Sequence, residues 1–328
     1  MLTPAKELRL AIDSCELPHP LYIHQLTYLE RRVEDAIDGA PACVERVIGP
    51  SRVGKSMLIN ALARKFPEQK IDGRRYVPVV VVRVPTPVSP LLLPSSVLEA
   101  LKVPVQRRIT SGAMGSRMLE QLRLAGVRAL IFEEASHLVE PGARVPPRAA
   151  GDWFKALADS LNLTIILLGV PRLDRLFESN EQLRLRASAA SHFRPYDSRV
   201  QEGMQAFHTC VASYAHLFRK FGFPIELSSR ALTYQCYLLT GGLIGVLSRF
   251  MQELAIQRKR ETPRALTCAD CWAAAQNVES AGSPHFRAFS DATLLESVAP
   301  AALHHAFVQV MNDNGMAVPI IKEPGEVK

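Results

Sequence analysis

No apolar run in this sequence is long enough to cross a membrane. The longest, VPVVVV and TIILLGV, fall far short of the roughly 20 residues that a transmembrane helix needs. The N-terminal stretch MLTPAKELRLAIDSCE mixes charges into its apolar positions and lacks a signal-peptide core. These absences predict a cytoplasmic protein without a membrane partner.

Cysteine is scarce and irregularly spaced. Six cysteines are scattered along 328 residues, which predicts reduced thiols rather than a disulfide framework. Cys268 and Cys271 make a C-x-x-C pair, but no second pair of cysteine or histidine ligands stands at a matching interval for a structural zinc ion. We therefore interpret both as core-facing residues of a helix.

The remaining composition is that of an ordinary folded protein, with 48% hydrophobic and 22% charged residues. A length of 328 residues predicts two domains. The net charge of +7 makes an acidic polymer such as a nucleic acid a reasonable partner.

Short apolar runs rich in β-branched residues alternate with helical patterns before about residue 200. A strand ends near Ile48, and residues 76–84, 128–134 and 164–170 are continuous apolar runs typical of strands buried on both faces. Helical patterns fill the intervals. The predicted fold class is therefore α/β, a parallel sheet flanked by helices and joined by right-handed crossovers.

The stretch ERVIGPSRVGKSMLINAL contains the motif G-x-x-x-x-G-K-[ST] between a predicted strand and a predicted helix. Gly49 and Gly54 let the backbone wrap so that its N–H groups face phosphate oxygens, and the following helix adds its positive end. Lys55 would carry charge to the β- and γ-phosphates, and the Ser56 hydroxyl would bind Mg²⁺. The expected nucleotide-binding residues are Gly49, Pro50, Ser51, Arg52, Val53, Gly54, Lys55, Ser56 and Met57.

An acidic pair closes the apolar strand of ALIFEEASHL. A P-loop enzyme needs an acidic residue at the tip of a neighbouring buried strand to hold the magnesium ion. The usual pair is Asp-Glu; here the first position is Glu133, whose additional methylene extends the carboxylate by about 1.5 Å. We expect Glu133 to hold the metal and Glu134 to act as general base on the attacking water.

The surrounding sequence narrows the class of P-loop protein. It has no N/T-K-x-D motif for guanine recognition and no LSGGQ-like stretch of a transporter ATPase. The acidic strand is followed by a further strand with an arginine-bearing segment, LLGVPRLDRLFESNEQLRLR, and then by helical patterns. This order of elements is typical of an AAA+ protein. The predicted segments are a helical lead-in (1–40), the AAA+ P-loop ATPase core (41–200), a helical lid (201–280) and a loose C-terminal tail (281–328).

Several stretches together resemble the TniB/TnsC family of transposition ATPases, and TniB more closely by length. They are GPSRVGKS, LIFEEASHL, LLGVPRLDRLFESNEQLRLR and TGGLIGVLSRF, within residues 20–275. The resemblance implies an ATP-dependent regulator of a bacterial transposon that assembles as rings or helical filaments on duplex DNA, without sequence specificity. It further implies recruitment and activation of a DDE transposase of the TniA/TnsB type, usually with a TniQ-type targeting partner.

The resemblance also implies that Arg184 or Arg186 acts in trans on a neighbouring subunit's γ-phosphate. Arginine suits this role because it combines a permanent charge with a planar fork of donors. The chain departs from the family pattern at Glu133 in place of Asp, Ser136 in place of Gln and Val170 in place of Thr. We therefore expect slow hydrolysis, with ATP serving mainly as an assembly switch.

DNA contacts are expected between the second and third strands of the sheet, where AAA+ filaments on DNA place basic residues toward the bore. The stretch LKVPVQRRITSG supplies Lys102, Arg107, Arg108 and Thr110, which would contact phosphates without reading bases. A solvated loop between helices is the alternative interpretation.

Other functions stay open. One is a different DNA-associated AAA+ protein, such as a helicase loader or an initiator-like ATPase. Another is a non-hydrolysing ATP-binding scaffold, given Glu133 and Val170. A third is a small-molecule kinase, which should carry a lid with several arginines and a defined acceptor pocket; the sequence shows no such cluster.

Overall fold

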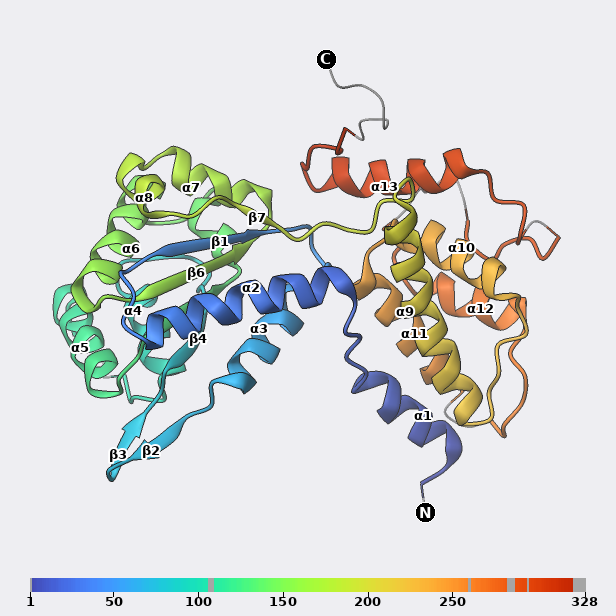
Figure 1. The fold of residues 1–328 in the computed structure, drawn as a ribbon, viewed down its shortest axis with the longest axis horizontal. Helices are drawn as coiled ribbons and strands as arrows, with labels where there is room; N and C mark the ends of the chain where they lie inside the picture. The colour runs from blue at the N-terminus through green and yellow to red at the C-terminus, as the bar shows by residue number, and fades with distance from the viewer. Residues whose placement is uncertain (1, 106–108, 259–260, 282–286, 294, 321–328) are drawn as a thin grey trace. The chain divides into compact units, whose positions relative to one another are not determined.

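The computed structural model describes residues 2–105, 109–258, 261–281, 287–293 and 295–320. Over these residues the chain forms two compact units (Figure 1). The sheet unit comprises Leu21–Gly49 and Gly54–Phe193. The helical unit comprises Met1–Pro20, Pro50–Val53 and Arg194–Lys328.

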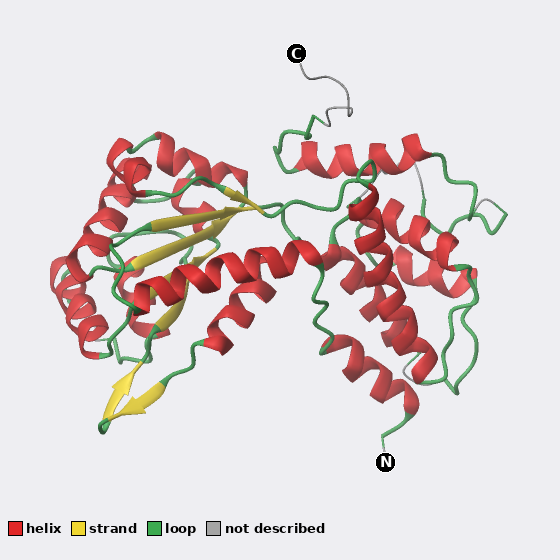
Figure 2. Ribbon diagram, viewed as in Figure 1, coloured by secondary structure: helices red, strands yellow, loops and turns green. Residues whose placement is uncertain are grey.

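The sheet unit is built on a parallel sheet, which in the described part of the chain has five strands in the order β4-β5-β6-β1-β7 (Figure 2). The strands are β1 (Val44–Ile48), β4 (Val79–Arg83), β5 (Ala129–Glu133), β6 (Thr164–Gly169) and β7 (Ser191–His192). The predicted α/β class and its first four strands are confirmed; the two-residue β7 is too short to leave a periodic pattern. Because the strands are parallel, their carboxyl ends lie along one edge of the sheet.

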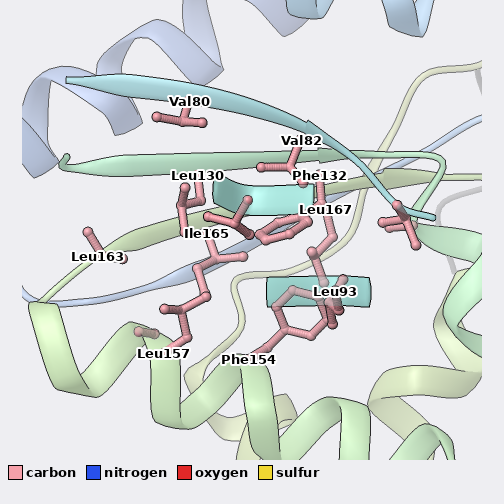
Figure 3. Packing of buried hydrophobic residues seen from close by; sticks show 14 of the residues in the cluster. Val80, Val82, Leu93, Leu130, Phe132, Phe154, Leu157, Leu163, Ile165 and Leu167 are labelled. Carbon is pink, nitrogen blue, oxygen red and sulfur yellow. The ribbon is translucent and has the colours of Figure 1, made fainter. Parts of the chain in front are cut away.

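The core of the sheet unit lies where β5 and β6 meet helix α6 (Pro147–Leu161). Phe132 of β5 and Phe154 of α6 are fully buried, and their ring centroids lie 5.0 Å apart at 83° (Figure 3). Leu157 and Leu167 pack in the same cluster. Burying one side chain of this size stabilises the fold by about 1.5–3 kcal/mol. The carboxyl ends of β5 and β6 are therefore held in place by a well-packed core.

The other helical segments of the sheet unit connect the strands. The sequence pattern predicts α2 well, since Leu29 and Val33 recur at a helical interval and are fully buried. The segments are α2 (Pro20–Ile37), α3 (Lys55–Lys65), α4 (Leu92–Ala100), α5 (Ser111–Leu124), α7 (Asp174–Glu178) and α8 (Glu181–Arg186), with short 3₁₀ turns η1 (Ala135–Val139) and η2 (Pro171–Leu173).

A small antiparallel hairpin projects from the sheet unit between α3 and β4 (Figure 1). It consists of β2 (Gln69–Ile71) and β3 (Arg74–Tyr76), joined by Asp72 and Gly73 at φ +48° and +76°. Two successive residues with positive φ form the tight turn that matches the twist of a hairpin, and Asp-Gly is a preferred pair for it. This hairpin was not predicted from the sequence.

The described part of the helical unit is built from helices, as expected for residues 201–280. The segment 281–328, expected to be a loose tail, instead includes α13, which buries Phe307, Val310 and Met311 and packs against α10. Its apolar spacing was masked by the surrounding Pro and Gly breaks. The helices of this unit are α1 (Pro4–Asp13), α9 (Gln201–Lys220), α10 (Ser229–Thr240), α11 (Ile244–Gln257), α12 (Cys268–Gln276) and α13 (Pro300–Asp313).

A membrane-spanning helix must be both long and apolar. Among the described residues no single helix meets both requirements, and only α10 and α11 taken together do, as a pair bent by 113°.

Candidate nucleotide-binding site

The phosphate-binding motif occupies the turn from β1 into α3, at the carboxyl edge of the sheet. Gly54 adopts φ +113°, a conformation that residues with a side chain rarely take. Helix α3 begins at the next residue, Lys55, and its N-cap residue, Gly54, has no side chain with which to cap the first turn. The N–H groups and positive end of this helix therefore favour an anion at this position.

The Lys55 side chain reaches back across the phosphate-binding loop to Gly49, the first residue of the motif. Its Nζ donates a hydrogen bond to the Gly49 carbonyl at 2.9 Å. Burial lowers the pKa of Lys55 to about 8, while the nearby Glu134 and Glu133 carboxylates act in the opposite direction. The side chain is thus held within the loop, close to where the motif places a nucleotide's phosphates.

Ser56 and Glu133 bring the loop and strand β5 together. The Ser56 hydroxyl donates a hydrogen bond to the Glu133 carboxylate. A hydroxyl and a carboxylate side by side, next to a lysine and a helix N-terminus, are suitable oxygen donors for Mg²⁺ bound with phosphates. The residues present therefore fit a magnesium–nucleotide group, and the longer Glu133 side chain still reaches the Ser56 hydroxyl.

Glu134 follows β5 in a strained backbone conformation, with φ +57° and ψ +33°. A left-handed conformation costs a residue with a side chain roughly 1–2 kcal/mol, and such strain is concentrated at functional sites. The His137 amide donates to the Glu134 carbonyl at 3.0 Å, and the His137 ring bonds the Thr86 hydroxyl at 2.9 Å. These contacts fix the turn that carries Glu134. No role was predicted for His137, although it stands three residues after Glu134.

The departures at Ser136 and Val170 are structurally coupled. The Ser136 hydroxyl accepts from the Val170 amide at 2.8 Å and lies 3.2 Å from the Val170 carbonyl, to which it donates. A side chain at Gly169 would come within 2.4 Å of the Ser136 oxygen. Ser136 thus joins η1 to the end of β6, and Val170 brings no hydroxyl to this end of the strand.

A model of the family described as "Bacterial TniB protein" matches residues 18–195, more than half of the chain. The chain belongs to the TniB family. No curated protein sequence matches it. The predicted family resemblance is therefore confirmed by the family model and by the fold.

Solved structures of similar fold include proteins of Aeropyrum pernix and Pyrobaculum aerophilum. Aeropyrum pernix ORC2 has 14% identity and a TM-score of 0.60, covering 84% of this chain and 73% of that one. Pyrobaculum aerophilum Cdc6p has 12% identity and a TM-score of 0.61, covering 82% and 70%. The A. pernix ORC1 protein, solved in complex with DNA, has 13% identity and a TM-score of 0.54, covering 82% and 69%. At these identities the likeness shows the AAA+ fold alone.

The expected trans-acting arginines of this TniB protein lie on α8, whose amino end is capped by the buried Asn180. Both Arg184 and Arg186 are exposed, and Leu185 between them is 78% exposed. Arg186 pairs with Asp159 of α6 at 3.1 Å. The structure thus gives Arg186 a partner within its own chain, which favours Arg184 for a contact with another subunit.

The outer residues of the phosphate loop belong to the helical unit and contact two of its helices. The Gly245 amide, at the start of α11, donates to the Arg52 carbonyl at 3.0 Å. The Ser51 amide donates to the side-chain oxygen of Asn314, directly after α13, at 3.3 Å. No role was predicted for Gly245 or Asn314, because contacts between such distant positions leave no local pattern in the sequence. The TGGLIG motif that contains Gly245 contributed to the family resemblance, but the sequence did not indicate which residues it contacts.

The four residues expected to contact DNA differ in their place in the structure. Arg107 and Arg108 lie outside the described residues. Thr110 is the N-cap of α5 and accepts a hydrogen bond from the Ala113 amide. Lys102 follows α4, with its side chain 79% exposed. Of the two described residues, Lys102 is therefore the one that presents a cation to solvent.

Proposed function

We propose that this TniB protein is an ATP-dependent, DNA-binding regulator of transposition in the bacterial cytoplasm. ATP binding drives its assembly into a ring or helical homo-oligomer on target duplex DNA, without sequence specificity. The assembled form recruits and activates a DDE transposase of the TniA/TnsB type, with a TniQ-type targeting protein as a further partner. The observation that carries this proposal is the joining of Lys55, Ser56 and Glu133 at one edge of a TniB sheet.

The chain's own residues account for a nucleotide-dependent switch. Bound ATP supplies the phosphoanhydride that is hydrolysed, and Ser56 and Glu133 would hold its Mg²⁺. Lys55 exchanges the Gly49 carbonyl for phosphate oxygens. Glu134, fixed by the His137 turn, accepts a proton from the attacking water. Arg184 of one subunit stabilises charge at the site of the next.

Hydrolysis in this scheme is slow and serves disassembly. Val170 offers no hydroxyl at the end of β6, and the Ser136 hydroxyl is already engaged by the Val170 backbone. A site with fewer hydrogen-bond donors stabilises the developing charge of the transition state less, and hydrolysis is therefore slower. Slow turnover leaves the ATP-bound oligomer on DNA long enough to engage a transposase.

An initiator-like ATPase or a non-hydrolysing scaffold is the alternative. The likeness to ORC and Cdc6 proteins supports the initiator-like alternative by fold alone, whereas the family model supports a transposition protein. Co-sedimentation of a TniA/TnsB-type transposase with duplex DNA distinguishes these functions. We expect the transposase to sediment only with the wild-type protein and ATP together, and not with Lys55→Ala. Equal sedimentation without the protein would contradict the recruiting role.

A further inference from the structure

The projecting β2–β3 hairpin places two cations directly opposite each other. Lys70 and Arg75 are paired residues in its register, so their side chains leave the same face of the hairpin. Like charges in directly opposite positions destabilise a strand pair. An isolated hairpin of three-residue strands gains nothing for its own stability from this arrangement.

Lys102 joins the same face through a shared carboxylate. Glu68 pairs with Arg75 at 2.7 Å and with Lys102 at 4.0 Å, and hydrogen bonding from Arg75 lowers the pKa of Glu68. Arg75 also donates to the Leu101 carbonyl at 2.7 Å, which anchors the hairpin beside α4. Among the described residues no carboxylate is paired with Lys70. The three cations of this hairpin face (Lys70, Arg75 and Lys102) therefore exceed its single paired carboxylate.

Lys102 itself occupies a position that normally selects glycine. It follows the C-cap of α4 with φ +59°. The Lys102 amide donates to the Glu99 carbonyl and the Val103 amide to the Leu98 carbonyl. This bond pattern is the Schellman motif, in which the left-handed residue is usually Gly. A lysine here costs backbone energy, and a strained residue on an exposed charged face points to a function.

We propose that the hairpin face of Lys70, Arg75 and Lys102 binds the phosphate backbone of duplex DNA. The proposal rests on the proposed function, and it extends the expected contact at Lys102 to a hairpin outside the predicted DNA-binding stretch. Arg75 is fixed by Glu68 and the Leu101 carbonyl, while Lys70 and Lys102 are exposed point charges on long stems. Such charges neutralise phosphates without reading bases, which suits a protein that loads onto DNA of any sequence.

Salt-dependent DNA binding tests the hairpin face. The double variant Lys70→Gln/Lys102→Gln is compared with wild type on a fluorescent duplex with ATP, over a range of salt concentrations. Two lost phosphate contacts should reduce the steepness of log affinity against log salt by about 2 and weaken binding roughly 60-fold at 0.1 M salt. The matched control, Lys155→Gln/Lys220→Gln, removes the same charge from α6 and α9 and should keep the wild-type slope.

The outcomes separate this proposal from the proposed function. A wild-type protein that does not bind duplex DNA with ATP contradicts the proposed function itself. Wild-type binding with an unchanged slope in Lys70→Gln/Lys102→Gln overturns the hairpin face alone. The same holds if this variant binds DNA normally but no longer recruits the transposase, because the face would then dock a protein. Binding of a fluorescent ATP analogue and an unchanged melting temperature show that the variant is folded.

Discussion

The amide of Gly245 donates a hydrogen bond to the carbonyl of Arg52, at 3.0 Å. Arg52 is the fourth residue of the phosphate-binding motif and has φ +63°, while Gly245 is the last residue of TGGLIG. A Cβ atom at position 245 would lie 2.2 Å from the Arg52 carbonyl oxygen. The glycine is therefore needed where α11 begins, since any side chain would displace the phosphate loop.

Gly245→Ala should weaken nucleotide binding. Relieving a backbone clash of this size costs about 1–3 kcal/mol, and because the loop must move to relieve it, we expect about tenfold weaker binding of a fluorescent ATP analogue. Gly115→Ala is the matched control, because that helical glycine of α5 has open space around it. Adding Arg52→Gly should restore part of the affinity by freeing the loop. Wild-type affinity in Gly245→Ala would show that this contact does not shape the loop.

The pH dependence of ATP affinity reports on Lys55. Burial lowers its pKa to about 8, so the lysine is charged below that pH and loses its charge above it. Phosphate binding favours the charged form and raises the pKa again. ATP affinity should therefore fall as pH rises, about tenfold between pH 7 and 9, with proton uptake on binding near pH 9. Calorimetry in buffers of different ionisation enthalpy measures this uptake. A flat affinity profile over that range would refute the assignment.

Glu134→Gln should separate assembly from hydrolysis. The amide keeps the size of the side chain but cannot accept the proton of the attacking water, so hydrolysis should fall on the order of a hundredfold or more. ATP binding and assembly on DNA should persist, and the oligomer should dissociate more slowly. Phosphate release and single-molecule dwell times measure the two effects. Failure of this variant to assemble with ATP would contradict the role given to Glu134.

Arg184 and Arg186 should differ in their effects. Arg184→Ala should bind ATP as a monomer yet lose most of the DNA-stimulated hydrolysis, on the order of a hundredfold or more. Arg186→Ala should lose less, since Arg186 is paired with Asp159 of its own chain. Mixing Arg184→Ala with Glu134→Gln should recover activity, because Glu134→Gln still assembles and supplies Arg184 to the intact site of its neighbour. No recovery in mixed oligomers would argue against action in trans.

The buried framework could be predicted from the sequence because its patterns are local. The runs that became β4, β5 and β6 are apolar on both faces, and a sheet covered by helices accommodates them. Within α2, Leu29 and Val33 are fully buried, whereas the apolar Ile23 is 46% exposed. Local periodicity thus indicated the elements but not every buried position.

The missed features depend on contacts between distant residues or on very short elements. The hairpin turn at Asp72 and Gly73 carried a recognisable pair, but strands of three residues are too short to show alternation. The contact of Asn314 with the Ser51 amide spans most of the chain and has no local signature. At the site, Lys55, Ser56 and Glu133 were predicted because the motif itself encodes their chemistry. How the chain holds them was not visible in the sequence.

The most direct test of the account is duplex-DNA binding with ATP, with ADP and without nucleotide, followed by anisotropy and negative-stain imaging, with Lys55→Ala as control. We predict tight binding and rings or filaments for the wild-type protein only with ATP, and neither for Lys55→Ala, which should retain its fold. Binding that is indifferent to nucleotide, or undiminished in Lys55→Ala, would contradict a nucleotide-switched DNA oligomer.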